Sequence, residues 1–304
     1  MIMQLKLNPA IHQALADQRP VVALESTVIA HGLPYPQNQD VARALESIVR
    51  ERGAQPATIG VVRGEPTIGL DADAIAHFAN GGDVLKLSRR DLALAVATGR
   101  DGATTVAGTM ALAHLAGIEV FATGGIGGVH RGARESWDVS ADLYELQRTP
   151  VLVVCAGAKS ILDLGATLEL LETLGVPVVG YGTDEFPAFY SQTSGLKLAA
   201  RADTADQIAA LWRAHRAIGG GSGMLVVVPP PAETALATEE VEAAVARALA
   251  DAQRQGVLGA AVTPFLLSAM KDQTGGRSLT ANVALLKNNA QVAAEIAVAL
   301  TSNE

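Results

Sequence analysis

The sequence contains very little cysteine and few aromatic residues. Its 304 residues include a single cysteine, Cys155, which stands inside an apolar run. One cysteine cannot form a disulfide within the chain, so a disulfide-stabilised fold is excluded and a reducing compartment is expected. Phe, Trp and Tyr make up 4% of the residues, whereas glycine occurs 30 times. This balance is typical of tight strand-to-helix turns around a core of Ala, Val and Leu, with Cys155 as a core residue.

Two further absences limit where the protein can act. No apolar run reaches the ~18 uninterrupted residues of a membrane helix, and the opening stretch MIMQLKLNPAIHQALADQRP lacks the basic and apolar segments of a secretory signal. The formal net charge is −8, so broad binding to nucleic acid or to anionic membranes is not expected. The sequence therefore predicts a soluble, cytoplasmic protein without nucleic-acid or membrane partners.

Short apolar runs alternate with helical patterns along most of the chain. The expected strands are PVVALES, ATIGVV, PTIGL, DVLKLS, GIEVFAT, PVLVVCA, VPVVGY, LKLAARA and GMLVVVP, and the expected helices are 37–53, 71–80, 89–99, 104–116, 160–174, 203–218 and 238–255. Two more helical patterns follow the last strand. The alternation predicts a three-layer α/β/α fold with a central mixed, mainly parallel sheet and a C-terminal helical layer, in one domain over 1–304.

Lysine is also scarce, with six lysines against seventeen arginines. Lys159 follows the apolar run VLVVC, and Lys86 lies inside DVLKLS. Ligands of open α/β folds bind at the carboxyl ends of parallel strands, where a desolvated lysine amine suits carbonyl chemistry. The alternative is a lysine whose stem packs on the core while its ammonium reaches water. Ser160 is placed to cap the helix expected at 160–174.

Glu25 is a carboxylate at the end of another apolar run, VVALE. If desolvated, it would have a raised pKa and could exchange protons near neutrality; the alternative is a hydrogen bond to nearby backbone. His31 is either a second candidate for proton exchange or an ordinary loop residue. Asn282 either faces a ligand or lies on a helix surface. Together with the two lysines, Glu25 suggests imine chemistry on a phosphorylated sugar.

The longest irregular stretch, ATGGIGGVHRGARESWDVSADL, holds glycines at 124, 125, 127 and 128. Such a loop allows close backbone approach to a ligand, and His130, Arg131 and Arg134 could meet a phosphate. The alternative is a surface loop with scattered charge. Further on, Glu135, Asp138 and Asp142 offer oxygen ligands for Mg²⁺ or Mn²⁺, although Asp142 could instead favour the start of a helix capped by Ser140.

These stretches, taken in order, resemble the pseudouridine-5′-phosphate glycosidase family. The matching blocks are ALESTVIAHGLPYPQN, TIGVVRGEPTIGL, KLSRRDL, GATTVAGTMALAHLAGIEVFATGGIGGVHRGA, WDVSADL, VVCAGAKSILD, TPFLL and NNAQVAAEIA. The resemblance covers nearly the whole chain and implies the indigoidine synthase A-like fold. Some relatives carry a fused sugar-kinase domain, for which this chain is too short. The segment RGARESWDVSADL differs from the commoner sequence of the family at Arg134 and Trp137.

The resemblance implies a role for each matching residue. Lys159 would be the nucleophile, Glu25 the proton donor, and Asp138 the ligand of one Mn²⁺ per subunit, or of Mg²⁺ or another divalent ion in its place. The residues implied to contact substrate are Lys86, Val106, Ser140, Ala141, Asp142, Thr123, His130 and Asn282. A homotrimer is also implied.

The implied reaction is the reversible conversion of pseudouridine 5′-phosphate and water into uracil and ribose 5-phosphate, a step of nucleotide metabolism. A carbon–carbon glycosidic bond offers no nitrogen or oxygen leaving group to protonate. Opening the ribose ring and attaching C1′ to a lysine amine supplies an electron sink instead. Two alternatives stay open: a Schiff-base aldolase or lyase acting on another sugar phosphate, and a non-catalytic nucleotide-binding protein.

Overall fold

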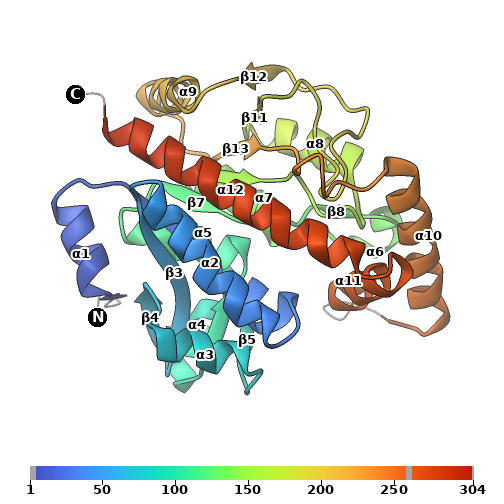
Figure 1. The fold of residues 1–304 in the computed structure, drawn as a ribbon, viewed down its shortest axis with the longest axis horizontal. Coiled ribbons are helices and arrows are strands. Elements are labelled where there is room, and N and C mark those ends of the chain that lie inside the picture. The colour runs from blue at the N-terminus through green and yellow to red at the C-terminus, as the bar shows by residue number, and fades with distance from the viewer. Residues whose placement is uncertain (1–4, 258–261, 303–304) are drawn as a thin grey trace.

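The computed structural model describes residues 5–257 and 262–302 (Figure 1). The helices are α1 (Pro9–Ala16), α2 (Gln37–Glu51), α3 (Ala72–Ala79), α4 (Arg89–Thr98), α5 (Val106–Leu115), α6 (Ala133–Ser136), α7 (Ala141–Arg148), α8 (Leu164–Thr173), α9 (Ala205–Ala217), α10 (Thr238–Arg254), α11 (Val262–Gln273), α12 (Arg277–Thr301) and the π-helix η1 (Val28–Gly32). The strands are β1 (Lys6–Leu7), β2 (Val21–Leu24), β3 (Gln55–Val62), β4 (Glu65–Ile68), β5 (Leu85–Leu87), β6 (Gly102–Thr104), β7 (Val120–Ala122), β8 (Val129–His130), β9 (Leu152–Cys155), β10 (Leu162–Asp163), β11 (Val178–Tyr181), β12 (Ala200–Ala202) and β13 (Met224–Val227).

The central sheet is mixed and mainly parallel, which confirms the predicted fold class. Its strands follow the order β1-β4-β3-β2-β7-β9-β13-β11-β12, and β5 and β6 join through β3. All pairs from β3 to β12 along this path are parallel, whereas β4 and β6 pair antiparallel with β3. Strands β2, β9 and β13 are buried along their whole length, as expected for parallel strands covered on both faces.

Helices cover both faces of this sheet. On one face the long helix α12 crosses β2, β7 and β9 and packs against α2 and α9 (Figure 1). On the other, α5 packs on β2 and β3 and is flanked by α4 and α7. The C-terminal helical layer predicted from the sequence is therefore present. No helix in the described part of the chain is long and apolar enough to span a membrane.

Three expected helices begin at least two residues later than the sequence pattern predicted: those at 160–174, 104–116 and 203–218, the last of which begins at Ala205. The helix expected at 160–174 begins at Leu164, because Leu162 and Asp163 form β10 and pair with β8. Its N-cap is Asp163, whose carboxylate accepts from the Ala166 N–H at 2.9 Å, so the predicted cap at Ser160 is wrong. The helix expected at 104–116 begins at Val106, because residues 102–104 form β6 and Thr105 is the N-cap.

The register of the sheet brings several strand ends to one edge. Leu24 of β2 pairs with Ala122 of β7, and Ala122 pairs with Val154 of β9. The residues that follow these strands, Glu25 and Thr123 among them, therefore emerge side by side at the carboxyl edge. In open α/β sheets this edge is where ligands bind.

Candidate active site at the carboxyl edge of the sheet

A cavity of about 70 Å³ at this edge brings together residues that lie far apart in the sequence. The three chemically active side chains predicted from the sequence, Glu25, Lys86 and Lys159, all line it. The other lining residues are Thr27, Val28, His31, Gly32, Gly124, Gly125, Phe189, Leu267, Asn282 and Leu286. A carboxylate and two amines therefore share one small, mostly apolar space.

The carboxyl group of Glu25 is buried and hydrogen-bonded to a neighbouring side chain. Burial raises the pKa of its carboxyl group, and this effect outweighs the opposing influence of the Lys159 ammonium. The hydroxyl of Thr123, a buried side chain at the exit of β7, donates a hydrogen bond to Oε1 of Glu25 and also opposes the rise in pKa. A carboxyl group with a raised pKa retains its proton closer to neutrality.

Lys86 and Lys159 reach the cavity from two separate strands. Lys86 is the middle residue of β5, and Lys159 lies past the end of β9, where its N–H donates to the carbonyl of Ile126 at 3.1 Å. Burial lowers the pKa of Lys86, and the positive charge of Lys159 lowers it further. Two lysine amines therefore reach one cavity, where an uncharged amine could attack a carbonyl carbon.

The glycine loop lets an aromatic ring close one wall of the cavity. A Cβ at Gly125 would lie 2.6 Å from the ring of Phe189, so only glycine permits this packing. Phe189 itself has a φ of 62°, an uncommon value for a bulky residue. Its N–H donates to the carbonyl of Ala156 at 3.2 Å, which ties the ring to the end of β9. No sequence signal singled out Phe189, because it lies in a loop without any regular pattern.

Asp142 connects the start of two helices to the glycine loop. Its buried carboxylate accepts from the N–H of Ala107 at 3.0 Å and from that of Gly127 at 2.8 Å. Both oxygens are therefore engaged by backbone N–H groups, one at the start of α5 and one in the glycine loop. Ser140 is the N-cap of α7, as predicted, and accepts from the Asp142 N–H at 3.2 Å.

Val106 and Ala141 are the first residues of α5 and α7. The Val106 side chain is buried, so only its backbone N–H is suited to meet a polar ligand. The N–H of Thr105 donates to the carbonyl of Leu87 at 2.9 Å, which places the start of α5 at the end of the strand that carries Lys86. Two helix N-termini and a lysine in one region are features of the kind that can bind phosphate. Neither Val106 nor Ala141 lines the cavity itself, and the Asp142 carboxylate accepts from the first turn of α5.

Asp138 and His130 lie beside each other in the glycine-rich loop. Nδ1 of His130 is 3.7 Å from Oδ2 of Asp138, and the Asp138 side chain is 41% exposed. Burial lowers the pKa of His130, against the opposing effect of Asp138. Within residues 5–257 and 262–302, no three His, Cys, Asp or Glu side chains form a metal-binding group. A single accessible carboxylate fits a hard cation that keeps most of its water ligands, but not a closed protein cage.

The arginines of the loop do not behave as the sequence suggested. Arg131 makes two 2.8 Å hydrogen bonds to the Glu242 carboxylate and also donates to the carbonyls of Leu162 and Ser160. It is therefore a structural clamp, and its expected role as a phosphate ligand is not supported. Arg134 is exposed on α6.

Helix α12 contributes two asparagines at this edge of the sheet. Asn282 lines the cavity, as does His31 from η1, so both face the candidate site. Asn289 is fully buried and donates to the carbonyls of Thr123 and Gly124 at 2.8 and 3.3 Å. Sequence reasoning missed Asn289, since an asparagine in a helical pattern gives no sign of which backbone it will meet.

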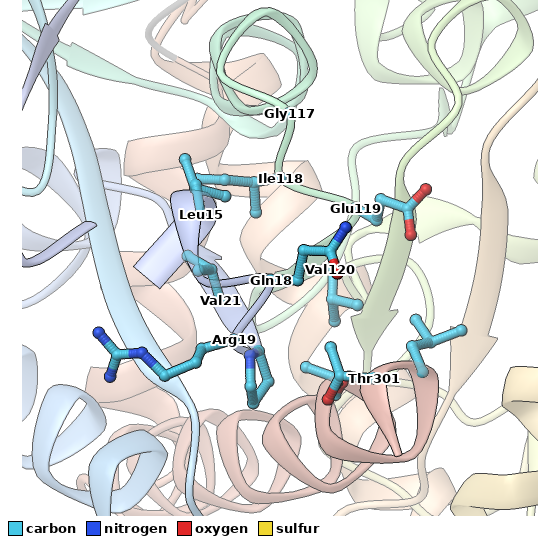
Figure 2. Close-up of a pocket in the computed structure, with 12 residues that line it drawn as sticks. Leu15, Gln18, Arg19, Val21, Gly117, Ile118, Glu119, Val120 and Thr301 are labelled. Atoms are coloured by element: carbon cyan, nitrogen blue, oxygen red, sulfur yellow. The ribbon is translucent and has the colours of Figure 1, made fainter. Parts of the chain in front are cut away.

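Two other features lie outside the candidate site. Cys155 is buried, and burial raises the pKa of its thiol to about 12, which confirms a core residue and not a nucleophile. A cavity of about 260 Å³ lies at the opposite, amino edge of the sheet, where Val21 and Val120 begin β2 and β7 (Figure 2). Its charged lining residues are Arg19 and Glu119, and none of the three active-site candidates reaches it.

Comparisons with known proteins show the family to which the chain belongs. Residues 10–299 match the family model described as indigoidine synthase A like protein. The chain is 65% identical to pseudouridine-5′-phosphate glycosidase of Herpetosiphon aurantiacus over 98% of both chains. It is 61% identical to the protein of the same name from Chloroflexus aurantiacus, covering 98% of this chain and 99% of the relative.

Solved structures show the same fold. The prealnumycin C-glycosynthase AlnA in complex with ribulose 5-phosphate superposes with a TM-score of 0.92 at 41% identity, over 99% of this chain and 98% of AlnA. An indigoidine synthase A-like protein from Thermotoga maritima superposes with a TM-score of 0.89 at 36% identity, over 98% and 96% of the two chains.

Proposed function

The chain belongs to the indigoidine synthase A like family, and from this premise we propose that it is a pseudouridine-5′-phosphate glycosidase. It converts pseudouridine 5′-phosphate and water reversibly into uracil and ribose 5-phosphate. The observation that carries the proposal is the shared cavity of Glu25, Lys86 and Lys159 in a chain so similar to proteins of that name. AlnA, a C-glycosynthase whose structure was solved with ribulose 5-phosphate, supports a reaction at a carbon–carbon glycosidic bond.

We propose that Lys159 is the nucleophile and Glu25 the proton donor. The Lys159 amine bonds to C1′ of the ribose as the C1′–O4′ bond breaks and O4′ takes up a proton. The nitrogen lone pair then forms a C=N bond as the C1′–C5 bond to the base breaks, and C5 takes a proton from Glu25. Water hydrolyses the imine and releases ribose 5-phosphate. The raised pKa of Glu25 supports this role, since the residue must arrive protonated.

The phosphate and the base occupy opposite ends of the site in this proposal. Lys86 and the backbone N–H groups that begin α5 and α7, at Val106 and Ala141, bind the 5′-phosphate. Asn282 faces the base, and Thr123 orients Glu25 between the two ends. This arrangement fixes C1′ over Lys159, which lowers the entropic cost of forming the covalent bond.

We further propose that Asp138 binds one Mn²⁺, or another hard divalent cation, mostly through water. The accessible carboxylate beside His130 and the absence of a three-ligand cluster within the described residues support a single protein ligand. Such an ion would supply positive charge that polarises or orients oxygens near the sugar.

We also propose that the protein forms a homotrimer and acts in the cytoplasm. Leu94 on α4 and Tyr144 on α7 are more than half exposed, and Trp137, which precedes α7, is 86% exposed. Exposed large side chains of this kind are suited to a subunit interface. Sedimentation equilibrium would give three times the chain mass, and a monomer mass would contradict the trimer without touching the reaction.

The reaction is tested by incubating the protein with Mn²⁺, uracil and ribose 5-phosphate and analysing the mixture by liquid chromatography and mass spectrometry. We expect pseudouridine 5′-phosphate to form. Turnover of a ketose or deoxyribose phosphate without that product would favour an aldolase. Binding of the nucleotide without any product would favour a non-catalytic binding protein.

A further inference from the structure

A second cavity of about 240 Å³ adjoins the active-site cavity. The two share His31, Gly32, Leu267 and Asn282 in their walls. The active-site cavity alone, at about 70 Å³, is smaller than the roughly 300–1,000 Å³ of typical small-molecule sites. A nucleotide must therefore extend beyond the active-site cavity, and on the Asn282 side the base and any group attached to it can reach into the adjoining cavity.

The adjoining cavity has a positive and partly polar lining. It is built by the loop after η1, by α11 and by the beginning of α12, which contribute Leu33, Lys271 and Ser278, among others. Ser268, Leu279 and Tyr190 complete the wall beside Pro34. Lys271 is its one lysine, no Asp or Glu is among its lining residues in the described chain, and the positive end of the 25-residue helix α12 points toward it. This lining favours a small anionic group over a cation.

We propose that this cavity is a subsite for a carboxylate-bearing substituent on the base, so that the enzyme also acts on pseudouridine nucleotides whose uracil carries such a group on a ring nitrogen. The inference rests on the proposed function, because it assumes that the base lies against Asn282. It extends that function to a class of substrates that differ from pseudouridine 5′-phosphate only in the base.

The chemistry restricts where the substituent can be. C5 of the base is bonded to the ribose, C2 and C4 carry oxygens, and C6 lies next to the glycosidic carbon and points back toward the sugar. The two ring nitrogens are the positions from which a short chain can extend away from Lys159. A substituent there leaves the bond-breaking step unchanged, since the proton from Glu25 still goes to C5 and the same C1′–C5 bond breaks.

The test uses the synthetic direction with ribose 5-phosphate and a series of bases: uracil, its N1- and N3-carboxymethyl derivatives, and the neutral carbamoylmethyl derivatives of the same size. We expect product from uracil and from at least one carboxymethyl isomer. The kcat/KM of that isomer should exceed that of its carbamoylmethyl counterpart by about threefold to fivefold, the effect of one partly exposed ion pair. Product from uracil but from no substituted base would overturn the inference alone, whereas no product from uracil would overturn the proposed function as well.

Variants assign the effect to the cavity. Lys271→Gln should abolish the preference for carboxymethyl over carbamoylmethyl and leave the uracil reaction unchanged. Lys287→Gln, an exposed lysine on α12 outside the cavity, is the matched control and should change neither. Leu279→Phe should fill the cavity and block the substituted bases only, and Ser268→Phe at an exposed position of α11 does the same should Leu279→Phe fold poorly. An undiminished carboxylate preference in Lys271→Gln would contradict the subsite.

Discussion

The hydroxyl of Thr123 donates a hydrogen bond to the carboxylate of Glu25, although the two residues are 98 positions apart in the chain. They emerge from the carboxyl ends of the neighbouring strands β7 and β2. A hydrogen bond to a carboxylate stabilises its charged form and lowers its pKa, whereas burial raises it. Burial is the largest effect on the pKa of Glu25, and the positive charge of Lys159 and the Thr123 hydrogen bond oppose it; the hydrogen bond can be removed separately.

Thr123→Val should raise the pKa of Glu25 further. The substitution keeps the shape of the side chain but removes the donor, so the carboxyl group retains its proton to higher pH. If Glu25 is the proton donor, the alkaline limb of the pH profile of kcat/KM for cleavage moves to higher pH. Thr173→Val, an exposed threonine on α8, should leave the profile in place. An unmoved alkaline limb in Thr123→Val would show that this limb does not report Glu25.

Glu25→Gln should abolish turnover and stabilise the fold at neutral pH. Because the pKa of Glu25 is raised in the folded protein, the unfolded chain gives up this proton at lower pH than the native protein does. The contribution of Glu25 to stability is therefore greatest below its unfolded pKa near 4.5 and is lost as pH rises through the higher folded value. Urea unfolding of both proteins at pH 4 and pH 7 measures this. A stability gain of Glu25→Gln that does not grow with pH would contradict it.

Lys159→Ala and Lys159→Arg should both lose turnover while the protein stays folded. Alanine has no amine, and a guanidinium remains protonated and cannot attack carbon. Borohydride added during the reaction should trap a ribose-phosphate adduct on the peptide that contains Lys159, seen by mass spectrometry. Lys197→Ala, an exposed lysine paired with Glu185, is the control. Normal turnover in Lys159→Ala would remove the imine mechanism.

Asp138→Asn should raise the Mn²⁺ concentration needed for half-maximal activity by about tenfold or more, because the ion loses its charged protein ligand. A Mn²⁺ titration of the initial rate measures the change. Glu135→Gln removes a neighbouring exposed carboxylate on α6 and should have little effect. Equal shifts in both variants would indicate a general electrostatic effect and not a ligand.

Asn289→Ala should lower the free energy of unfolding by about 1–3 kcal/mol, because it leaves the buried carbonyl of Thr123 without its donor, whereas the carbonyl of Gly124 still accepts from the Ala156 N–H at 2.9 Å. Asn288→Ala on the same helix should cost less, since Asn288 is only half-buried and makes one 3.3 Å bond to Pro229. Urea denaturation of the two variants compares them. A larger loss of unfolding free energy in Asn288→Ala than in Asn289→Ala would contradict the greater structural role given to Asn289.

The amino-acid sequence by itself determined the class of fold and the residues to examine. Apolar runs such as VLVVC predict strands buried on both faces, because removing such side chains from water is favourable at any position in the sheet. The charges that end these runs, at Glu25 and Lys159, then lie at the carboxyl edge in any parallel arrangement. The resemblance to the glycosidase family was also carried by short stretches of sequence such as VVCAGAKSILD.

Only the tertiary structure decided how these residues are used. The partner of Arg131 is Glu242, 111 positions away, and the carbonyl of Thr123 meets Asn289, 166 positions away. Asp142 accepts from two backbone N–H groups because the start of α5 and the glycine loop converge on it. Hydrogen bonds and burial between distant segments depend on the order of the strands and the packing of α12. No local pattern encodes that arrangement.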